Sequence, residues 1–240
     1  MKEEVFKEKL KQRAKKIEVE LNDNQLELFF RYKNLILEWN EKINLTAIKE
    51  DEDFINKHFI DSLTIVKYLK NKKNRIIDVG TGAGFPGIPV NIYGKCNIVL
   101  FDSLNKRLKV LDDIIEKLKL SNIETLHGRA EETFKNKEYR EKFDVATSRA
   151  VANLNVLVEL MLPAVKIGGI CICMKAGNIG CEINEAKKAI QVLGGKIEKI
   201  ENLVLPDTDI ERSIIIIRKI KNIPNKFPRK PGTPAKEPIK

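Results

Sequence analysis

The chain has 240 residues, of which 42% are hydrophobic and 32% charged, a balance typical of a folded globular protein rather than a disordered one. The formal net charge of +10 favours a polyanionic partner, although a genome biased towards Lys, Ile and Asn would also produce it. No apolar run approaches the roughly 18 residues of a membrane span, and the first ten residues lack the apolar stretch of a signal peptide. We therefore expect no membrane association and a cytoplasmic protein.

The cysteines and histidines do not have the spacing of a metal site. There is no C-x-x-C pair, and the two histidines, His58 and His127, are too scattered to complete a zinc site. We expect no metal, and we interpret the cysteines as small buried hydrophobic residues, namely Cys96, Cys171, Cys173 and Cys181.

Residues 1–72 predict a helical N-terminal subdomain. One helix begins at Asn22, where Gln25 three residues later completes a capping pattern. A second covers residues 51–69, and we interpret His58 within it as a packing residue on the helix face. The polar stretch at 71–74 predicts the domain boundary. The first helix presents an apolar face made by Leu26, Phe29, Phe30 and Ile36.

From Arg75 the pattern changes to short apolar strands that alternate with helical stretches at 105–120 and 153–169. Such alternation predicts a parallel sheet with right-handed crossovers. The expected strands are 75–79, 97–102, 122–127, 143–148 and 169–174.

Two further strand-like runs, 194–206 and 211–220, end the domain. The short loop between them cannot hold a crossover helix, so these strands should be antiparallel. One reversed strand at the end of a parallel sheet favours a class I methyltransferase fold, which is Rossmann-like with seven strands, over residues 73–220. The remaining residues, 221–240, form a basic, proline-rich tail that we expect to be extended and not helical.

The segment RIIDVGTGAGFPGIPV at 75–90 places Gly80 and Gly82 directly after the first strand. Residues 82–87 satisfy the G-x-G-x-x-G pattern of dinucleotide-binding proteins. Read from Asp78, the same segment is an acid-x-G-x-G-x-G loop, and this carboxylate would repel a pyrophosphate but suit a cationic sulfonium and ammonium. A tight turn without a ligand is the remaining interpretation.

The next two strands also end in groups suited to a nucleoside. Asp102 stands 22 residues after Gly80, where a carboxylate can accept hydrogen bonds from ribose hydroxyls, or else cap the next helix. The backbone of Ala130 and the side chain of Glu131 can read an adenine edge, or simply begin a helix. Because ligands of open α/β sheets bind at the carboxyl ends of the strands, these groups together predict a nucleoside site.

The fourth strand ends in DVATSRAVANL, which lacks the motifs for methylating exocyclic amines or cytosine C5. Ser148 and Arg149 occupy the place where a ribose-methylating tetrad needs an acid, although Lys175 and Glu211 could serve that tetrad in part. Guanine N7 remains, because its lone pair needs no proton removed. We therefore expect no catalytic base, with Arg149 and Lys175 holding phosphate or a base edge unless they are ordinary surface charges.

Seven segments in order resemble the bacterial 16S ribosomal RNA guanine-N7 methyltransferase family (RsmG, also called glucose-inhibited division protein B). They are WNEKINLTAI, HFIDSL, IIDVGTGAGFPGIP, FDSLNKRLKVL, GRAEE, SRAVANL and FPRKPGTPAKEPI. The resemblance implies methyl transfer from S-adenosylmethionine to guanine N7 in 16S rRNA or the small ribosomal subunit, by a protein we expect to be monomeric. It implies cofactor contacts at Gly80, Phe85, Ala130, Glu131 and Arg149, and related folds add Asp102 at the ribose.

We further expect RNA contacts from Lys175 and from the tail residues Lys226, Arg229 and Lys230. Two other functions stay open at this point. The G-x-G-x-x-G match would suit a nicotinamide-dependent oxidoreductase, and the basic tail would suit a ribosome-associated RNA-binding module without activity.

Overall fold

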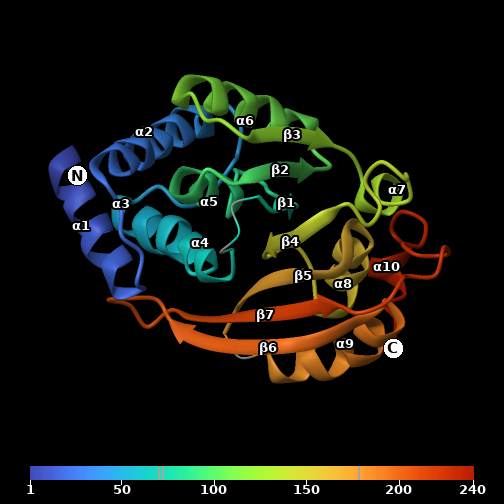
Figure 1. The fold of residues 1–240 in the computed structure, drawn as a ribbon. Coiled ribbons are helices and arrows are strands. Elements are labelled where there is room, and N and C mark those ends of the chain that lie inside the picture. Colours follow the sequence, from blue (N-terminus) through green and yellow to red (C-terminus); the bar gives the residue numbers. More distant parts are fainter. Residues whose placement is uncertain (70, 72, 178) are drawn as a thin grey trace.

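A seven-stranded sheet runs through the computed structural model, which describes residues 1–69, 71, 73–177 and 179–240 (Figure 1). The strands are β1 Arg75–Val79, β2 Asn97–Asp102, β3 Ile123–His127, β4 Phe143–Arg149, β5 Val165–Ala176, β6 Gly195–Val204 and β7 Glu211–Lys219. The α-helices are α1 Glu3–Lys16, α2 Asp23–Asn40, α3 Asp51–Asp53, α4 Asp61–Leu63, α5 Gly87–Gly94, α6 Asn105–Leu118, α7 Ala130–Thr133, α8 Leu154–Met161, α9 Gly180–Val192 and α10 Thr233–Lys236. A π-helix, η1 Phe54–Ile60, and two 3₁₀ helices, η2 Val66–Tyr68 and η3 Leu162–Ala164, complete the set.

The strand order is β3-β2-β1-β4-β5-β7-β6, and β7 runs antiparallel to both of its neighbours. This confirms the predicted mostly parallel sheet with one reversed strand. That strand lies between β5 and β6 rather than at the edge of the sheet. β6 and β3 are the two edge strands, and the charged side chains of β6, such as Lys196 and Glu198, discourage pairing with another chain.

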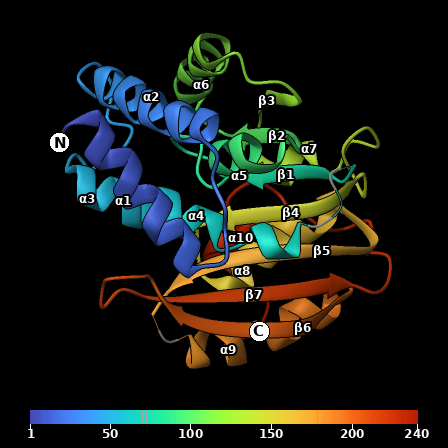
Figure 2. The ribbon, with the colours of Figure 1, turned by 60° about the vertical axis from the view of Figure 1, so that its left-hand side comes forward.

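The N-terminal helices cover one face of the sheet, as Figure 2 shows for α1, α2 and α4. Their apolar side chains form one buried cluster with residues of β1, β5 and β7. Asn22 and Gln25 make the predicted capping box at the start of α2. The single tryptophan, Trp39, donates from Nε1 to Asp113 Oδ2 at 2.7 Å and so ties α2 to α6.

The predicted continuous helix over residues 51–69 is wrong in detail, because its centre is the π-helix η1. Phe54 and Phe59 are five residues apart, both fully buried, and their rings meet at 5.6 Å. The wider turn of a π-helix brings residues at this spacing onto one face. The predicted boundary at 71–74 follows η2, and residues 70 and 72 at that point lie outside the described residues.

The opposite face is covered by α8, α9 and the C-terminal tail, which pack on a second buried cluster. The prediction of an extended, non-helical tail is wrong, because Thr233–Lys236 form the single helical turn α10, with Pro234 in its first turn. The prediction that all cysteines are buried is also wrong. Cys96, Cys171 and Cys173 are buried, whereas Cys181 is exposed on α9.

Among the described residues, no helix is both long and apolar enough to span a membrane. Nor do the described residues contain a group of three or more His, Cys, Asp or Glu side chains placed to hold a metal ion.

Candidate functional site

The glycine loop between β1 and α5 has a backbone that other residues cannot easily adopt. Gly80, Gly82 and Gly84 have φ values of 72°, 59° and 95°. Asp78 fastens the loop, since its Oδ2 accepts from Thr81 Oγ1 at 2.6 Å and from Gly87 N at 3.0 Å. The Asp78 carboxylate thus holds both ends of the loop, a role that the sequence analysis did not foresee.

Free space lies beside this loop. A Cβ added at Gly82 would meet no atom within 4 Å, so one side of the loop is open there. At Gly80 the same atom would lie 2.6 Å from Cγ2 of Val151, a half-exposed apolar residue just after β4. Asp78 Oδ1 is buried without a hydrogen-bond partner in the described chain, and burial raises the pKa of this carboxyl to about 6. An open glycine backbone beside a carboxylate fits a ligand with a cationic group.

Asp102 lies beside this loop at the end of β2 and is nearly buried. Its Oδ2 accepts from Gly82 N at 2.9 Å, and its Oδ1 accepts from Leu104 N at 2.9 Å. The second bond closes a turn between β2 and α6. It does not cap α6, whose first residue is Asn105. Each oxygen keeps a second lone pair, which leaves the predicted ribose contact chemically available.

Phe85 and Arg149 meet on the far side of the loop. The Phe85 ring stacks on His58 with centroids 4.1 Å apart and an interplanar angle of 4°. The guanidinium carbon of Arg149 lies 5.1 Å from the centroid of the Phe85 ring. Two residues predicted as cofactor contacts are therefore joined through His58, which the sequence analysis treated only as packing.

His58 is held neutral in this arrangement. Arg149 Nη2 donates to Nδ1 at 3.1 Å, so the ring proton sits on Nε2 and is donated to Thr46 Oγ1 at 2.9 Å. Burial first, and the charge of Arg149 second, lower the pKa of His58 to about 3. The imidazole is thus a fixed spacer between Phe85 and Arg149.

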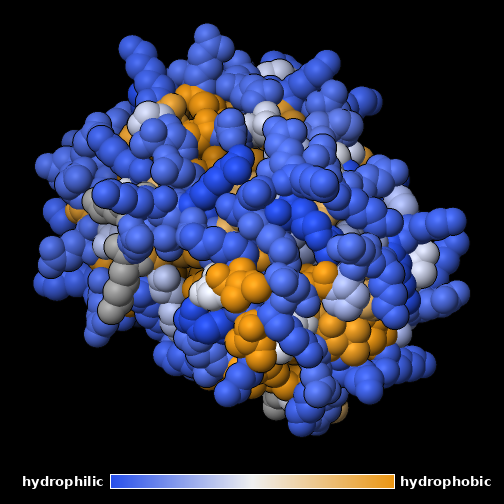
Figure 3. Space-filling view, turned by 45° about the vertical axis from the view of Figure 1, so that its right-hand side comes forward, coloured by the Kyte–Doolittle hydropathy of each residue, from blue (hydrophilic) through white to orange (hydrophobic). Residues whose placement is uncertain are grey.

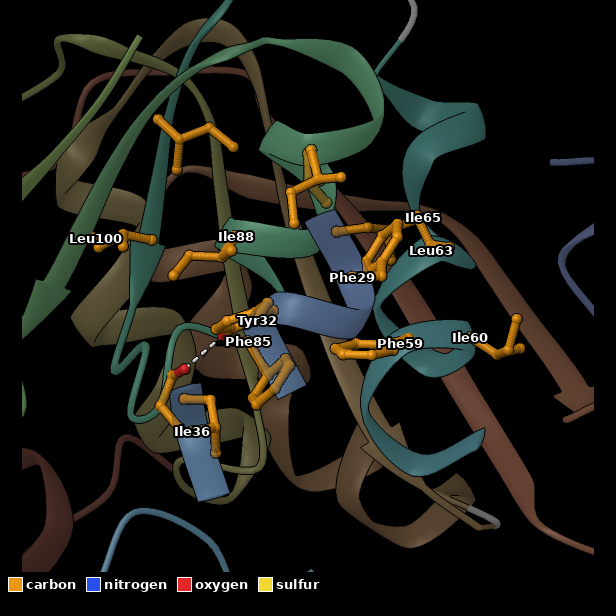
Figure 4. Packing of buried hydrophobic residues seen from close by; sticks show 14 of the residues in the cluster. Phe29, Tyr32, Ile36, Phe59, Ile60, Leu63, Ile65, Phe85, Ile88 and Leu100 are labelled. Atoms are coloured by element: carbon orange, nitrogen blue, oxygen red, sulfur yellow. Dashed lines mark hydrogen bonds between the residues drawn. The ribbon is translucent and has the colours of Figure 1, made fainter. Parts of the chain in front are cut away.

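Tyr32 on α2 supports the loop from below and was missed by the sequence analysis. Its ring packs against those of Phe59 and Phe85, with centroids 5.8 and 5.4 Å away, and its hydroxyl donates to Ala83 O at 2.6 Å (Figure 4). Burial raises the pKa of the Tyr32 hydroxyl well above its usual value, so it remains a donor. A tyrosine on an apolar helix face has no sequence signature that distinguishes this role from packing.

A basic pocket of about 220 Å³ adjoins this cluster at the ends of β4 and β5. Asp61 at its wall accepts from Arg149 Nη1 and Arg212 Nε, both at 3.1 Å. Lys175 also lines the pocket, and its ammonium bonds to Ala152 O and pairs with Glu182. Asp61 and Arg212 were not predicted, because only the fold brings η1–α4 and β7 to these strand ends. A larger cavity of about 360 Å³, lined mainly by apolar side chains, lies elsewhere, beside the end of α5.

Residues 25–214 match the family described as GidB, rRNA small subunit methyltransferase G. The chain belongs to the GidB family. It is 51% identical over 240 residues to the ribosomal RNA small subunit methyltransferase G of Clostridium novyi, covering 99% of this chain and 98% of that protein. It is 53% identical over 221 residues to the protein of the same name from Clostridium tetani, covering 91% and 92% of the two chains.

Two solved structures share the fold of this GidB chain. The YcgJ protein of Bacillus subtilis has a TM-score of 0.54 at 12% identity, covering 69% of this chain and all of that one. M. jannaschii TYW2, solved in complex with AdoMet, has a TM-score of 0.51 at 16% identity, covering 64% of this chain and 72% of that one. At these identities the likeness concerns the fold alone, and it confirms the predicted Rossmann-like methyltransferase architecture.

The remaining predicted residues of this GidB chain lie around β3 and the tail. Ala130 begins α7, and Glu131 Oε1 accepts from Gly232 N at 3.1 Å. Lys226 and Lys230 are exposed, and hydrophilic side chains cover most of the face that comes forward in Figure 3. The guanidinium of Arg229 instead pairs with Glu159 at 2.7 Å, and its contact with RNA stays a prediction.

Proposed function

We propose that this chain transfers a methyl group from S-adenosylmethionine to N7 of a guanine in 16S ribosomal RNA of the small ribosomal subunit. The cofactor would lie along Gly80, Gly82 and Phe85, with Asp102 at its ribose and Ala130–Glu131 at its adenine. The basic pocket beside Arg149 would receive the guanine or its phosphate. We further propose that the enzyme acts as a cytoplasmic monomer.

The observation that carries this proposal is that the two side chains in the described lining of the pocket that could take up a proton, His58 and Asp61, both accept a hydrogen bond from the permanently charged Arg149. Both nitrogens of His58 are engaged, by Arg149 and by Thr46. Both oxygens of Asp61 accept from arginines. A reaction without proton removal suits such a site, and guanine N7 attacks through a free lone pair.

The cofactor supplies an electrophilic methyl on a sulfonium. The bond from N7 to this carbon forms as the bond from sulfur breaks, the sulfur keeps the electron pair, and the purine gains the positive charge. The work of the protein is to align the two groups and exclude water, and alignment alone can contribute about 7–11 kcal/mol. Arg149, placed between Phe85 and the pocket, is the residue best situated to hold the two groups together.

The test is methyl transfer by the purified protein to small ribosomal subunits, and separately to naked 16S rRNA, taken from cells that lack the modification. Mass spectrometry of nuclease digests distinguishes 7-methylguanosine from other methylated guanosines by retention time. The proposal predicts 7-methylguanosine in at least one substrate. A different methylated nucleoside, or no transfer to either substrate, would refute it.

Two controls address the other functions. Calorimetric titration with S-adenosylmethionine and with NAD should give binding of the first and not the second, whereas an oxidoreductase would reverse the result. An RNA-binding module without activity would bind the subunit and yield no labelled product.

A further inference from the structure

The C-terminal tail is docked on the protein by buried contacts. Ile223 and Phe227 are about 95% buried in the cluster under α8. Arg140 donates to the carbonyls of Phe227 at 2.7 Å and Ile223 at 3.0 Å. The tail is therefore held by its main chain, through these hydrogen bonds, as well as by its buried apolar side chains.

One ion pair sets the position of the tail along α8. Glu159 on α8 is fully buried, and its carboxylate accepts from Arg229 Nε, Nη2 and the Arg229 main-chain N–H, at 2.7 to 3.1 Å. Within the described residues, all hydrogen bonds to this carboxylate come from Arg229. Arg229 Nη1 also donates to Glu237 O at 2.7 Å and closes the tail on itself. A buried carboxylate with this single partner strongly disfavours an undocked tail.

The docked tail reaches the proposed cofactor site through one main-chain group. Three residues beyond Arg229, Gly232 has a φ of 81° and aims its N–H at Glu131 Oε1, 3.1 Å away. Glu131 follows β3, and Gly128 in the same connection donates to Asp102 O at 3.2 Å. The tail therefore contacts the group that we assign to the adenine end of the cofactor, next to the strand that carries Asp102.

We propose that the C-terminal tail is a part of the cofactor site, in which the Arg229–Glu159 pair places Gly232 so that it positions Glu131. The inference rests on the proposed cofactor site at Ala130–Glu131. Docking of the tail and binding of the adenine nucleoside then stabilise each other, because coupling between two binding events is reciprocal.

The experiment compares the full-length wild type with Arg229→Gln, using S-adenosylhomocysteine as the probe. Calorimetry gives its Kd, and hydrogen exchange follows the tail amides, Gly232 among them, with and without the probe. We expect the Kd to rise about tenfold in Arg229→Gln, and tail exchange in the wild type to slow on binding. The matched control is Lys236→Gln, which removes the same charge from an exposed tail residue and should leave the Kd within twofold of wild type.

The outcomes separate this inference from the proposed function. A wild type that does not bind the probe refutes the cofactor site itself. If the wild type binds but its tail exchange is the same with and without the probe, the coupling is refuted, whatever Arg229→Gln does. An equal loss of affinity in Arg229→Gln and Lys236→Gln would also refute it, because net charge and not tail position would then be responsible.

Discussion

Substitution of Tyr32 by phenylalanine removes one oxygen from the interior and leaves the ring contacts in place. That oxygen donates to Ala83 O at 2.6 Å, and a buried carbonyl left without a partner costs about 1–3 kcal/mol. The cost falls on the glycine loop, because Tyr32 comes from α2 and touches the loop directly (Figure 4). If about 1–2 kcal/mol of it is lost from cofactor binding, the Kd rises about 5- to 30-fold.

Calorimetry with S-adenosylhomocysteine measures this change, and urea unfolding measures the accompanying loss of stability. Tyr68→Phe is the matched control, since the hydroxyl that it removes donates to Glu201 on β6, away from the loop. We expect an unchanged Kd in the control. A Tyr32→Phe protein that is destabilised by 1 kcal/mol or more but binds the probe within twofold of wild type would refute the reasoning, because Tyr32 would then support folding alone.

Three further predictions follow from the loop, His58 and the tail. Gly87→Ala should lower the unfolding free energy by about 1–3 kcal/mol, because the new Cβ would lie 2.3 Å from a buried side chain. Gly82→Ala meets no atom within 4 Å, but the φ of 59° strains an alanine by about 1–2 kcal/mol, so this variant should lose stability and, in addition, bind the cofactor more weakly than Gly87→Ala does. Thermal melts and calorimetry check both, and equal cofactor affinities in the two variants would contradict this. The pKa of His58 is lowered from 6.5 to about 3, so between these pH values the unfolded chain binds one proton more than the folded chain, and stability falls by up to about 1.4 kcal/mol for each pH unit of acidification. In urea titrations, the wild type should lose more stability between pH 7 and pH 4 than His58→Gln does. Identical losses would count against a neutral buried ring. Replacing both Lys226 and Lys230 by glutamine should weaken RNA binding. The slope of the logarithm of the binding constant against the logarithm of the salt concentration should fall by about 1.4, because each phosphate contact with a single strand contributes about 0.7. An unchanged slope in filter-binding assays would show that neither lysine contacts phosphate.

The mostly parallel sheet could be predicted because it follows from a local pattern, and so could the grouping of Gly82 and Asp102 at the ends of their strands. Alternating strands and helices impose a parallel sheet, and a parallel sheet brings the residues at its strand ends together. Gly82 and Asp102, 20 residues apart, are accordingly hydrogen bonded. The short connection at 205–210 likewise required β6 and β7 to be antiparallel.

The hydrogen-bond partners of individual side chains could not be predicted, because composition does not encode the direction in which a side chain points. Asp78 was expected to face a ligand, but its Oδ2 accepts two hydrogen bonds from within the glycine loop. Arg229 was read as a surface cation because of its basic neighbours, yet its partner Glu159 is 70 residues away in the sequence. Asp61 and Arg212 meet across 151 residues, a separation at which residue spacing gives no signal.

Because Trp39 on α2 is hydrogen bonded to Asp113 on α6, its fluorescence reports on the packing of α2 against α6. Trp39 is the only indole in the sequence, so intrinsic emission at long wavelengths comes from this one helix. Tyr32 lies on the same helix two turns earlier. Any shift in α2 that accompanies ligand uptake can therefore be followed in the unlabelled protein by stopped-flow fluorescence.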